Sequence, residues 1–356
     1  MIDPRYTQLA KILTQYSIKV KKGQHIHVQC IGIAALPLAR EAVKEVWRLG
    51  AHPYLDVIDD TLSEYFYSVA TKEHLEKKPA VAQFITKWSD SSIIIVGDEN
   101  SRSLAHTDPH KMLKRQVLMK HIREMRLNKP WVLTDVPTHG LAQDAGMSTE
   151  AFENFYFGAV LRDWKTEGKR FSKLGKLLSN AKLIEVRGVE TDLKMSAKGR
   201  IFVPDNGECN MPGGEVFTAP VETSVEGHVY FNFPLLRQGK FIRDIRLWFE
   251  KGKIVKATAS ENEEYLNKIL DTDKGARYLG EFAIGMNPGI HTYMNNVLFD
   301  EKIEGTIHMA VGMAYKDCNG ANKSTIHMDI VKDMHSKGSS VIVDSKTILK
   351  EGKLLF

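Results

Sequence analysis

The stretch 305–330 carries four side chains whose donor atoms suit a metal ion. They are His308, Tyr315, His327 and Asp329. Apolar and β-branched residues fill 306–311 and 325–331, and the Asn319-Gly320 dipeptide between them readily reverses two strands. We therefore expect a β-hairpin that brings the four donors together. The chemistry open to such a set is metal-assisted catalysis.

The pairing of this hairpin decides which donors meet. A turn centred on that dipeptide sets His308 opposite Val331 and near His327 and Asp329. Because His327 and Asp329 are two residues apart, a strand directs both to one face, where they can hold one ion. A single buried histidine is usually a satisfied core residue, and His-x-Asp occurs by chance in many chains. The hairpin alone leaves a metal site and a structural role equally open.

Tyr315 lies seven positions from His308, an odd number that would turn it to the other face of a flat strand. We expect a β-bulge at Gly312 to bring it back.

Two carboxylates upstream stand in unusual settings. Glu215 follows a Met-Pro-Gly-Gly turn and begins a strand-like run. Glu281 follows Gly280, which we expect to end a helix that starts at Ser260, where Ser260 and Glu263 have capping-box spacing. Apolar residues follow each acid, so each enters a core and needs a compensating cation. A metal ion would supply it, and an Arg or Lys partner is the structural alternative.

Four blocks of the chain, taken in order, resemble the aminopeptidase T family of metallopeptidases, which are broad-specificity exopeptidases. The blocks are MPGGEVFTAP, LGEFAIGMNP, KIEGTIHMAVGMAY and STIHMD. The resemblance implies two metal ions per chain, peptide substrates with a free N-terminus, and a homodimer whose subunits enclose the active sites. The ligands it implies are Glu215, Glu281, His308, Tyr315, His327 and Asp329. The segment between Tyr315 and His327 is shorter than in longer family members, which leaves substrate preference open.

Three carboxylates and two neutral imidazoles fit a pair of divalent cations. Such ions lie roughly 3.5–4 Å apart and lower the pKa of bound water from about 15.7 to about 7. One ion can also bind the neutral α-amine of the substrate, which restricts cleavage to the first residue. Activity should therefore rise towards mildly alkaline pH. We expect zinc because it is the most readily available of the ions that fit these ligands, and cobalt or manganese fits them as well.

Roles within the set follow in part from ligand type. Glu281 or Asp329 is the expected bridge, because a carboxylate can bind two ions where an imidazole cannot. Tyr315 is either a ligand or a hydrogen-bond donor to the oxyanion. We assign catalytic roles to Glu281 and Tyr315, and the residue that shuttles protons stays open.

The N-terminal half alternates strand and helix patterns. Buried strands are expected at 25–31, 52–58, 92–97 and 130–136, with helical stretches between them. This order predicts an α/β domain over 1–180 with a mainly parallel sheet, bordering the active-site cleft. Residues 181–356 are predicted to form an α+β domain with a mostly antiparallel sheet that carries the metal site.

Composition excludes several classes of protein. Three scattered cysteines indicate a reducing compartment, and the N-terminus has neither a signal peptide nor a membrane anchor, so we expect a cytoplasmic protein. A net charge of +5 is too small for a nucleic-acid partner, and the basic runs are expected to be solvated helix faces. Dinucleotide, P-loop, HExxH and GxSxG motifs are absent.

Two other classes of function compete with a dinuclear aminopeptidase. A mononuclear non-haem iron dioxygenase that cleaves the ring of a dihydroxypyridine would use two histidines and one carboxylate. The presence of both Glu215 and Glu281 argues against it, because one iron needs open positions. A non-catalytic protein that binds RNA through basic helices is the third hypothesis, and the complete ligand set argues against it.

Overall fold

The structure is a computed structural model that describes residues 3–356. Its chain forms two compact units. The first runs up to Arg162 and includes 207–212, and the second comprises 163–206 and 213–356. The boundary predicted near residue 180 lies one helix beyond this division. Helix α9 (Trp164–Leu177) packs on β7 (Val203–Asp205) and β9 (Glu215–Thr218) and so belongs to the second unit.

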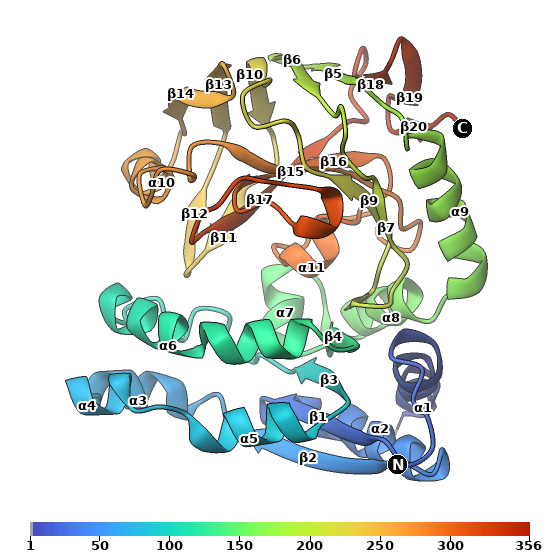
Figure 1. Cartoon of the computed structure of the whole chain (residues 1–356), viewed down its shortest axis with the longest axis vertical. Coiled ribbons are helices and arrows are strands. Elements are labelled where there is room, and N and C mark those ends of the chain that lie inside the picture. The colour runs from blue at the N-terminus through green and yellow to red at the C-terminus, as the bar shows by residue number, and fades with distance from the viewer. Residues whose placement is uncertain (1–2) are drawn as a thin grey trace. The chain divides into compact units, whose positions relative to one another are not determined.

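The first unit is built on a parallel sheet in the strand order β2-β1-β3-β4-β8 (Figure 1). Its strands are β1 (His25–Ile31), β2 (His52–Ile58), β3 (Ser91–Val96), β4 (Trp131–Asp135) and β8 (Asn210–Met211). The predicted α/β fold with a mainly parallel sheet is confirmed, and the four predicted strands agree to within one residue at each end. Apolar runs such as Ile93–Ile95 are buried, as expected where helices cover a parallel sheet.

Helices connect these strands, and α2 packs on β1 and β2. They are α1 (Pro4–Lys11), which continues as a π-helical turn (Ile12–Ser17), α2 (Leu36–Arg48) after a 3-10 turn (Ile33–Ala35), α3 (Leu62–Val69), α4 (Lys72–Glu76), α5 (Ala80–Trp88), α6 (Pro109–Leu127), α7 (His139–Asp144) and α8 (Thr149–Val160).

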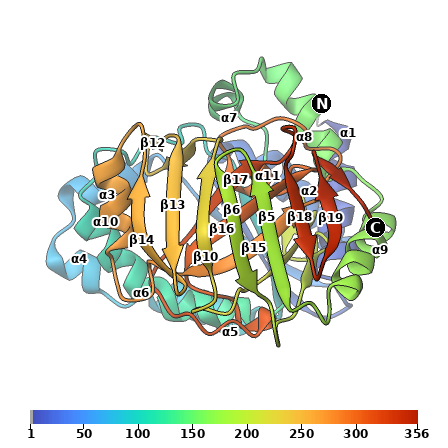
Figure 2. The same ribbon diagram turned by 90° about the horizontal axis from the view of Figure 1, so that it is seen from above.

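The second unit contains two antiparallel sheets, one above the other in Figure 1, and Figure 2 shows the larger sheet face on. The eight-stranded sheet has the order β14-β13-β10-β6-β5-β18-β19-β20. Its strands are β5 (Leu183–Gly188), β6 (Thr191–Ser196), β10 (Glu226–Phe231), β13 (Ile245–Glu250), β14 (Lys253–Thr258), β18 (Ser340–Val343), β19 (Lys346–Lys350) and β20 (Lys353–Leu354). Leu193 and Met195 of β6 are buried between exposed neighbours, so this sheet has one core face and one solvated face.

The five-stranded sheet has the order β17-β16-β15-β9-β7 and lies deeper in the unit. Its strands are β7 (Val203–Asp205), β9 (Glu215–Thr218), β15 (Leu279–Gly285), β16 (Thr306–Gly312) and β17 (His327–Asp333). Every residue of β15 and β16 is buried. A separate hairpin of β11 (Leu235–Arg237) and β12 (Lys240–Ile242), the helices α10 (Glu263–Leu270) and α11 (Val297–Asp300), and a 3-10 turn (Lys316–Cys318) complete the unit.

The helix predicted to start at Ser260 and end at Gly280 is wrong at both ends. Helix α10 begins after Asn262, whose left-handed backbone turns the chain, and no side chain caps it. Gly280 lies inside β15, where an added Cβ would approach the Met313 carbonyl oxygen to 2.3 Å. The glycine is therefore explained by the close approach of two backbones.

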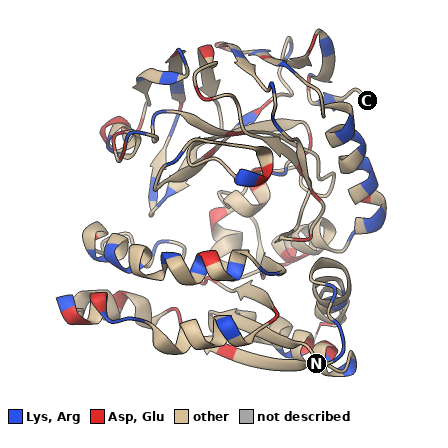
Figure 3. Cartoon of the chain, viewed as in Figure 1, with Lys and Arg blue, Asp and Glu red and all other residues tan. Residues whose placement is uncertain are grey.

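The basic residues of α9 lie along its exposed side, as Figure 3 shows. Phe171 and Leu174 of the same helix are buried. This division is that of an amphipathic surface helix. Within residues 3–356, helices that combine the length and the apolar character needed to cross a bilayer are absent.

Candidate metal centre

Strands β16 and β17 pair in the register predicted from the sequence, with His308 opposite Val331 and Gly312 opposite His327. The turn differs from the prediction. Strand β16 ends at Gly312 and β17 begins only at His327, so Asn319, which follows the 3-10 turn, lies within a longer loop. Pairing is thus fixed by the alternation of side chains rather than by a tight two-residue turn.

The register of the whole five-stranded sheet explains why the donors meet. Glu281 lies opposite Ala310, and Ala310 lies opposite Asp329, so these three share one face. His308 and His327 are each two residues from a member of that row and point to the same face. Glu215 joins it through its pairing with Gly285, four residues from Glu281. The small side chains of Ala283, Gly285 and Ala310 on this face leave room for the donors.

Each of five predicted ligands has a donor atom within ion-pair distance of at least one other. His308 Nε2 is 3.2 Å from Glu215 Oε2 and 3.3 Å from Glu281 Oε1. His327 Nε2 is 3.3 Å from Glu281 Oε2 and 3.4 Å from Asp329 Oδ1. Glu281 therefore presents one carboxylate oxygen to each imidazole. Two groups of donors suited to an ion result, and Glu281 belongs to both.

Backbone carbonyls orient both imidazoles. Nδ1 of His308 lies 3.0 Å from the Glu301 carbonyl oxygen, and Nδ1 of His327 lies 2.7 Å from that of Met313. A carbonyl only accepts, so Nδ1 carries the proton and donates in each case. The Nε2 lone pair of the neutral ring is then directed at the carboxylates, which is the arrangement of a metal-ligating histidine.

The buried carboxylates and imidazoles of the cluster shift one another's pKa values. Burial raises the pKa of the Glu215 carboxyl to about 8. Burial alone would lower the pKa of His308, but the carboxylates of Glu215 and Glu281 raise it to about 10. Among residues 3–356, Glu215 Oε2 and Glu281 Oε2 are buried and accept no hydrogen bond, although each faces an imidazole nitrogen. Divalent cations between these atoms would satisfy the carboxylates and keep the imidazoles neutral.

Tyr315 lies in the loop after β16 rather than on the sheet. Its ring centroid is 4.8 Å from that of His327 and 5.9 Å from that of Phe217, and the side chain is 38% exposed. The bulge predicted at Gly312 is not formed, because β16 pairs with β17 without a shift in register. The chain turns after Gly312, and the loop returns Tyr315 to the ligand side. Partial burial raises the pKa of Tyr315 above its ordinary value.

Sequence reasoning missed two charged residues beside the cluster. Glu301 forms a third group of donors with His308 and Asp329. Lys302 is fully buried, and its ammonium contacts Glu301 and lies 3.3 Å from Glu215 Oε1. The lysine partner considered as a structural alternative for Glu215 is thus present in addition to His308. The available signal was the charged run Asp-Glu-Lys, which is separated from a buried strand by three residues.

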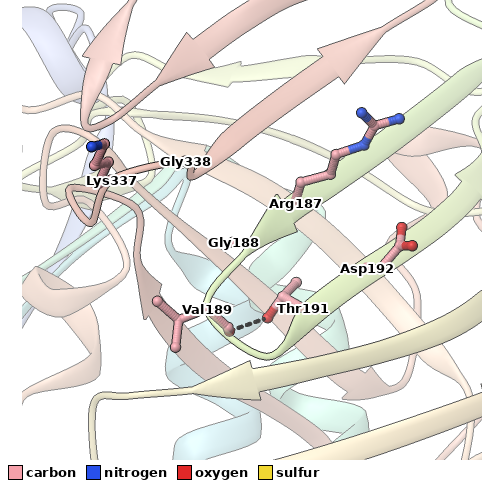
Figure 4. Close-up of a pocket in the computed structure, with 7 residues that line it drawn as sticks. All are labelled: Arg187, Gly188, Val189, Thr191, Asp192, Lys337 and Gly338. Carbon is pink, nitrogen blue, oxygen red and sulfur yellow. Dashed lines mark hydrogen bonds between the residues drawn. The ribbon is translucent and has the colours of Figure 1, made fainter.

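Two hollows on the second unit lie away from these residues. Figure 4 shows the first, of about 380 Å³, at the β5–β6 turn beside Lys337 and Gly338. The other, of about 480 Å³, lies over β14 and contacts Arg277. The predicted ligands line neither hollow, so the cluster is recognised by its donor atoms rather than by a cavity.

Comparison with known proteins gives a consistent answer. The family model of the thermophilic metalloproteases (M29) matches residues 2–354. Aminopeptidase AmpS of Bacillus subtilis is 31% identical, over 99% of this chain and 98% of its own. The structure of wild-type AmpT from Thermus thermophilus superposes with a TM-score of 0.87 at 24% identity, covering all of both chains. A 2,5-dihydroxypyridine dioxygenase from Pseudomonas putida superposes with a TM-score of 0.67 at 16% identity over 98% of this chain and 96% of its own, a likeness of fold alone.

Proposed function

The chain belongs to the thermophilic metalloprotease (M29) family, and on that premise we propose that the donors gathered by β9, β15, β16 and β17 are its metal ligands. Its activity is that of a metal-dependent aminopeptidase, a hydrolase that acts at the N-terminus of peptides. The proposed ligands are Glu215, Glu281, His308, His327 and Asp329, with Tyr315 beside them and Glu301 as an additional donor.

A single observation supports a pair of ions over one. The two oxygens of Glu281 face different imidazoles, Oε1 towards His308 and Oε2 towards His327, at 3.3 Å each. A carboxylate held in this way can bridge two cations, with Glu215 and His308 on one side and His327 and Asp329 on the other. Glu281 is therefore the carboxylate that both ions would share, and Asp329 would bind beside His327.

Divalent ions in these positions would activate water and polarise the scissile carbonyl. The protein's own groups supply orientation and protons. Glu281 fixes the spacing of the two positions, and the carbonyls of Glu301 and Met313 hold the imidazoles in the ligating tautomer. The ring of Tyr315 lies against His327, which suits its hydroxyl to donate a hydrogen bond to the oxyanion of the tetrahedral intermediate.

The metal and the assembly follow from chemistry and from the family resemblance. We propose zinc as the resident ion, with cobalt and manganese as functional substitutes, because oxygen-rich ligation with two imidazoles suits all three. We also propose a homodimer in the cytoplasm. Metal analysis and sedimentation of the purified protein test the first two of these statements.

The decisive experiment combines metal analysis with the hydrolysis of matched dipeptides. About two zinc ions per chain, with cleavage of a free dipeptide and none of its N-acetylated counterpart, would support the proposal. One iron per chain, with oxygen consumption on a dihydroxypyridine, would replace it with the dioxygenase function. Metal-replete protein that cleaves both peptides equally would contradict recognition of the α-amine.

A further inference from the structure

Lys302 places a fixed positive charge at one side of the proposed centre. Its side chain is fully buried, directly after α11. The ammonium contacts Glu301 Oε1, lies 3.3 Å from Glu215 Oε1 and lies 3.7 Å from Asp205 Oδ2. Asp205 pairs with Glu215 across β7 and β9, so the lysine reaches two neighbouring strands at once. A buried ammonium is costly unless carboxylates surround it, and here three do.

Lys302 and the proposed ion engage different oxygens of Glu215. The lysine lies against Oε1, whereas Oε2 faces His308 Nε2 at 3.2 Å. The two oxygens of Glu215 share one delocalised negative charge. The ammonium draws electron density towards Oε1, so Oε2 has less to donate to a bound metal ion. The lysine also contacts Glu301, the donor that is grouped with His308 and Asp329. The protein itself therefore partly neutralises Glu215, beside His308, and Glu301, beside His308 and Asp329.

Among the described residues, no lysine or arginine lies within ion-pair distance of Glu281 or Asp329 on the other side of the centre. Among residues 3–356, the ion-pair partners of Glu281 are His308 and His327, and that of Asp329 is His327. These imidazoles are neutral when they ligate a metal. Arg237 and Lys302 act on Asp329 from beyond ion-pair distance, so a divalent ion between His327 and Asp329 would meet carboxylates that no ammonium contacts directly. An ion between Glu215 and His308 has an ammonium as a close neighbour.

We propose that Lys302 makes the two metal positions unequal, so that the ion held by Glu215 and His308 binds more weakly and exchanges more readily than the ion held by His327 and Asp329. The inference rests on the proposed function, since it assumes that both positions bind metal. Repulsion between an ammonium and a divalent ion in a buried site is only weakly screened. Competition for Glu215 and Glu301 acts in the same direction.

The test is a metal titration of the full-length protein after removal of its ions. Co²⁺ serves as the probe, because its visible absorption reports each bound ion without an activity assay. We expect two steps whose dissociation constants differ at least tenfold in the wild-type protein. His308→Ala should remove the weaker step, and His327→Ala the tighter one. In Lys302→Met the weaker step should tighten at least tenfold, while the tighter step changes less than threefold.

A second buried lysine supplies a matched control. Lys332 is 1% exposed, and its ammonium donates to the carbonyl oxygens of Tyr230 and Val189 rather than to carboxylates. Lys332→Met should leave both steps within twofold of the wild type. If the weaker step of Lys302→Met is unchanged or weakened further, the proposal is overturned. Equal affinities of the two steps in the wild-type protein would also overturn it, and that measurement does not depend on whether any variant folds. Wild-type protein that binds no Co²⁺ at all would refute the proposed function as well.

Discussion

Replacing Lys332 with methionine should change the pH dependence of stability in a calculable way. The side chain lies on β17 and is 1% exposed, and its ammonium donates to the Tyr230 carbonyl oxygen at 2.8 Å and the Val189 carbonyl oxygen at 3.4 Å. Within residues 3–356, ion-pair partners for it are absent. Burial lowers the pKa of Lys332 from its ordinary 10.5 to about 8, against the weaker opposing effects of Asp333 and Glu190. The folded protein therefore holds this proton less tightly than the unfolded chain does.

The sign and size of the effect follow from that difference. Between pH 8 and 10.5 the unfolded state binds more protons at this position, so the contribution of Lys332 to stability rises with pH and is most unfavourable below pH 8. The lowered pKa corresponds to about 3 kcal/mol, at about 1.4 kcal/mol for each tenfold change in proton affinity. Methionine removes this penalty and also leaves two carbonyls without their donor, a cost of about 1 kcal/mol each that does not depend on pH. The variant should gain about 1 kcal/mol at pH 7 and lose about 2 kcal/mol near pH 10.5.

The assay is urea unfolding of both proteins in chelator, at several pH values from 7 to 10.5. The quantity to compare is the difference in unfolding free energy between variant and wild type, because all other titrating groups cancel in it. That difference should fall by about 3 kcal/mol across the range. Two pH profiles that stay parallel would refute the reasoning, since they would mean that Lys332 titrates alike in the folded and unfolded states.

Three further predictions concern the metal centre. Glu281→Gln should lower kcat/KM at least about 10³-fold, or about 4 kcal/mol, with an unchanged circular dichroism spectrum, because the amide cannot bridge two cations; activity within tenfold of the wild type would remove Glu281 from the centre. Tyr315→Phe keeps the ring contact with His327 and loses only the hydroxyl, so kcat should fall about 10²-fold with little change in KM, and an unaltered kcat would leave Tyr315 a packing residue. A chelator should abolish hydrolysis and lower the unfolding midpoint, because an ion at about 100 times its dissociation constant adds about 2.7 kcal/mol of stability; hydrolysis that persists in chelator would argue against a metal-dependent step.

The parts of the fold that the sequence predicted are those in which local pattern and tertiary position agree. Strand 25–31 is an apolar run bounded by turn residues, and the parallel sheet buries its centre. Strand 52–58 forms where it was predicted, but it lies at the edge of the sheet and is largely exposed rather than buried. The capping-box spacing at Ser260 misled, because Glu263 accepts a hydrogen bond from the Ala259 amide one residue before Ser260. Gly280 misled for a related reason. Its lack of a side chain is needed by the neighbouring strand β16, a contact that local sequence cannot report.

Some residues of the proposed centre lie on strands and could be predicted from the sequence pattern, whereas others lie in a loop and could not. Five of the six sequence-predicted donors lie on strands, where residues an even number of positions apart share a face, so their meeting needed only the correct order of β9, β15, β16 and β17. Glu301 and Lys302 lie between α11 and β16, where no periodicity links side-chain direction to spacing. Such residues are placed by the path of the loop, which depends on the packing of Phe299 and Ile303 into the core. The alternation of side chains along the strands predicts which ligands meet. It does not predict the charge of the centre, because Lys302, which contacts two of the acids, lies outside the strands.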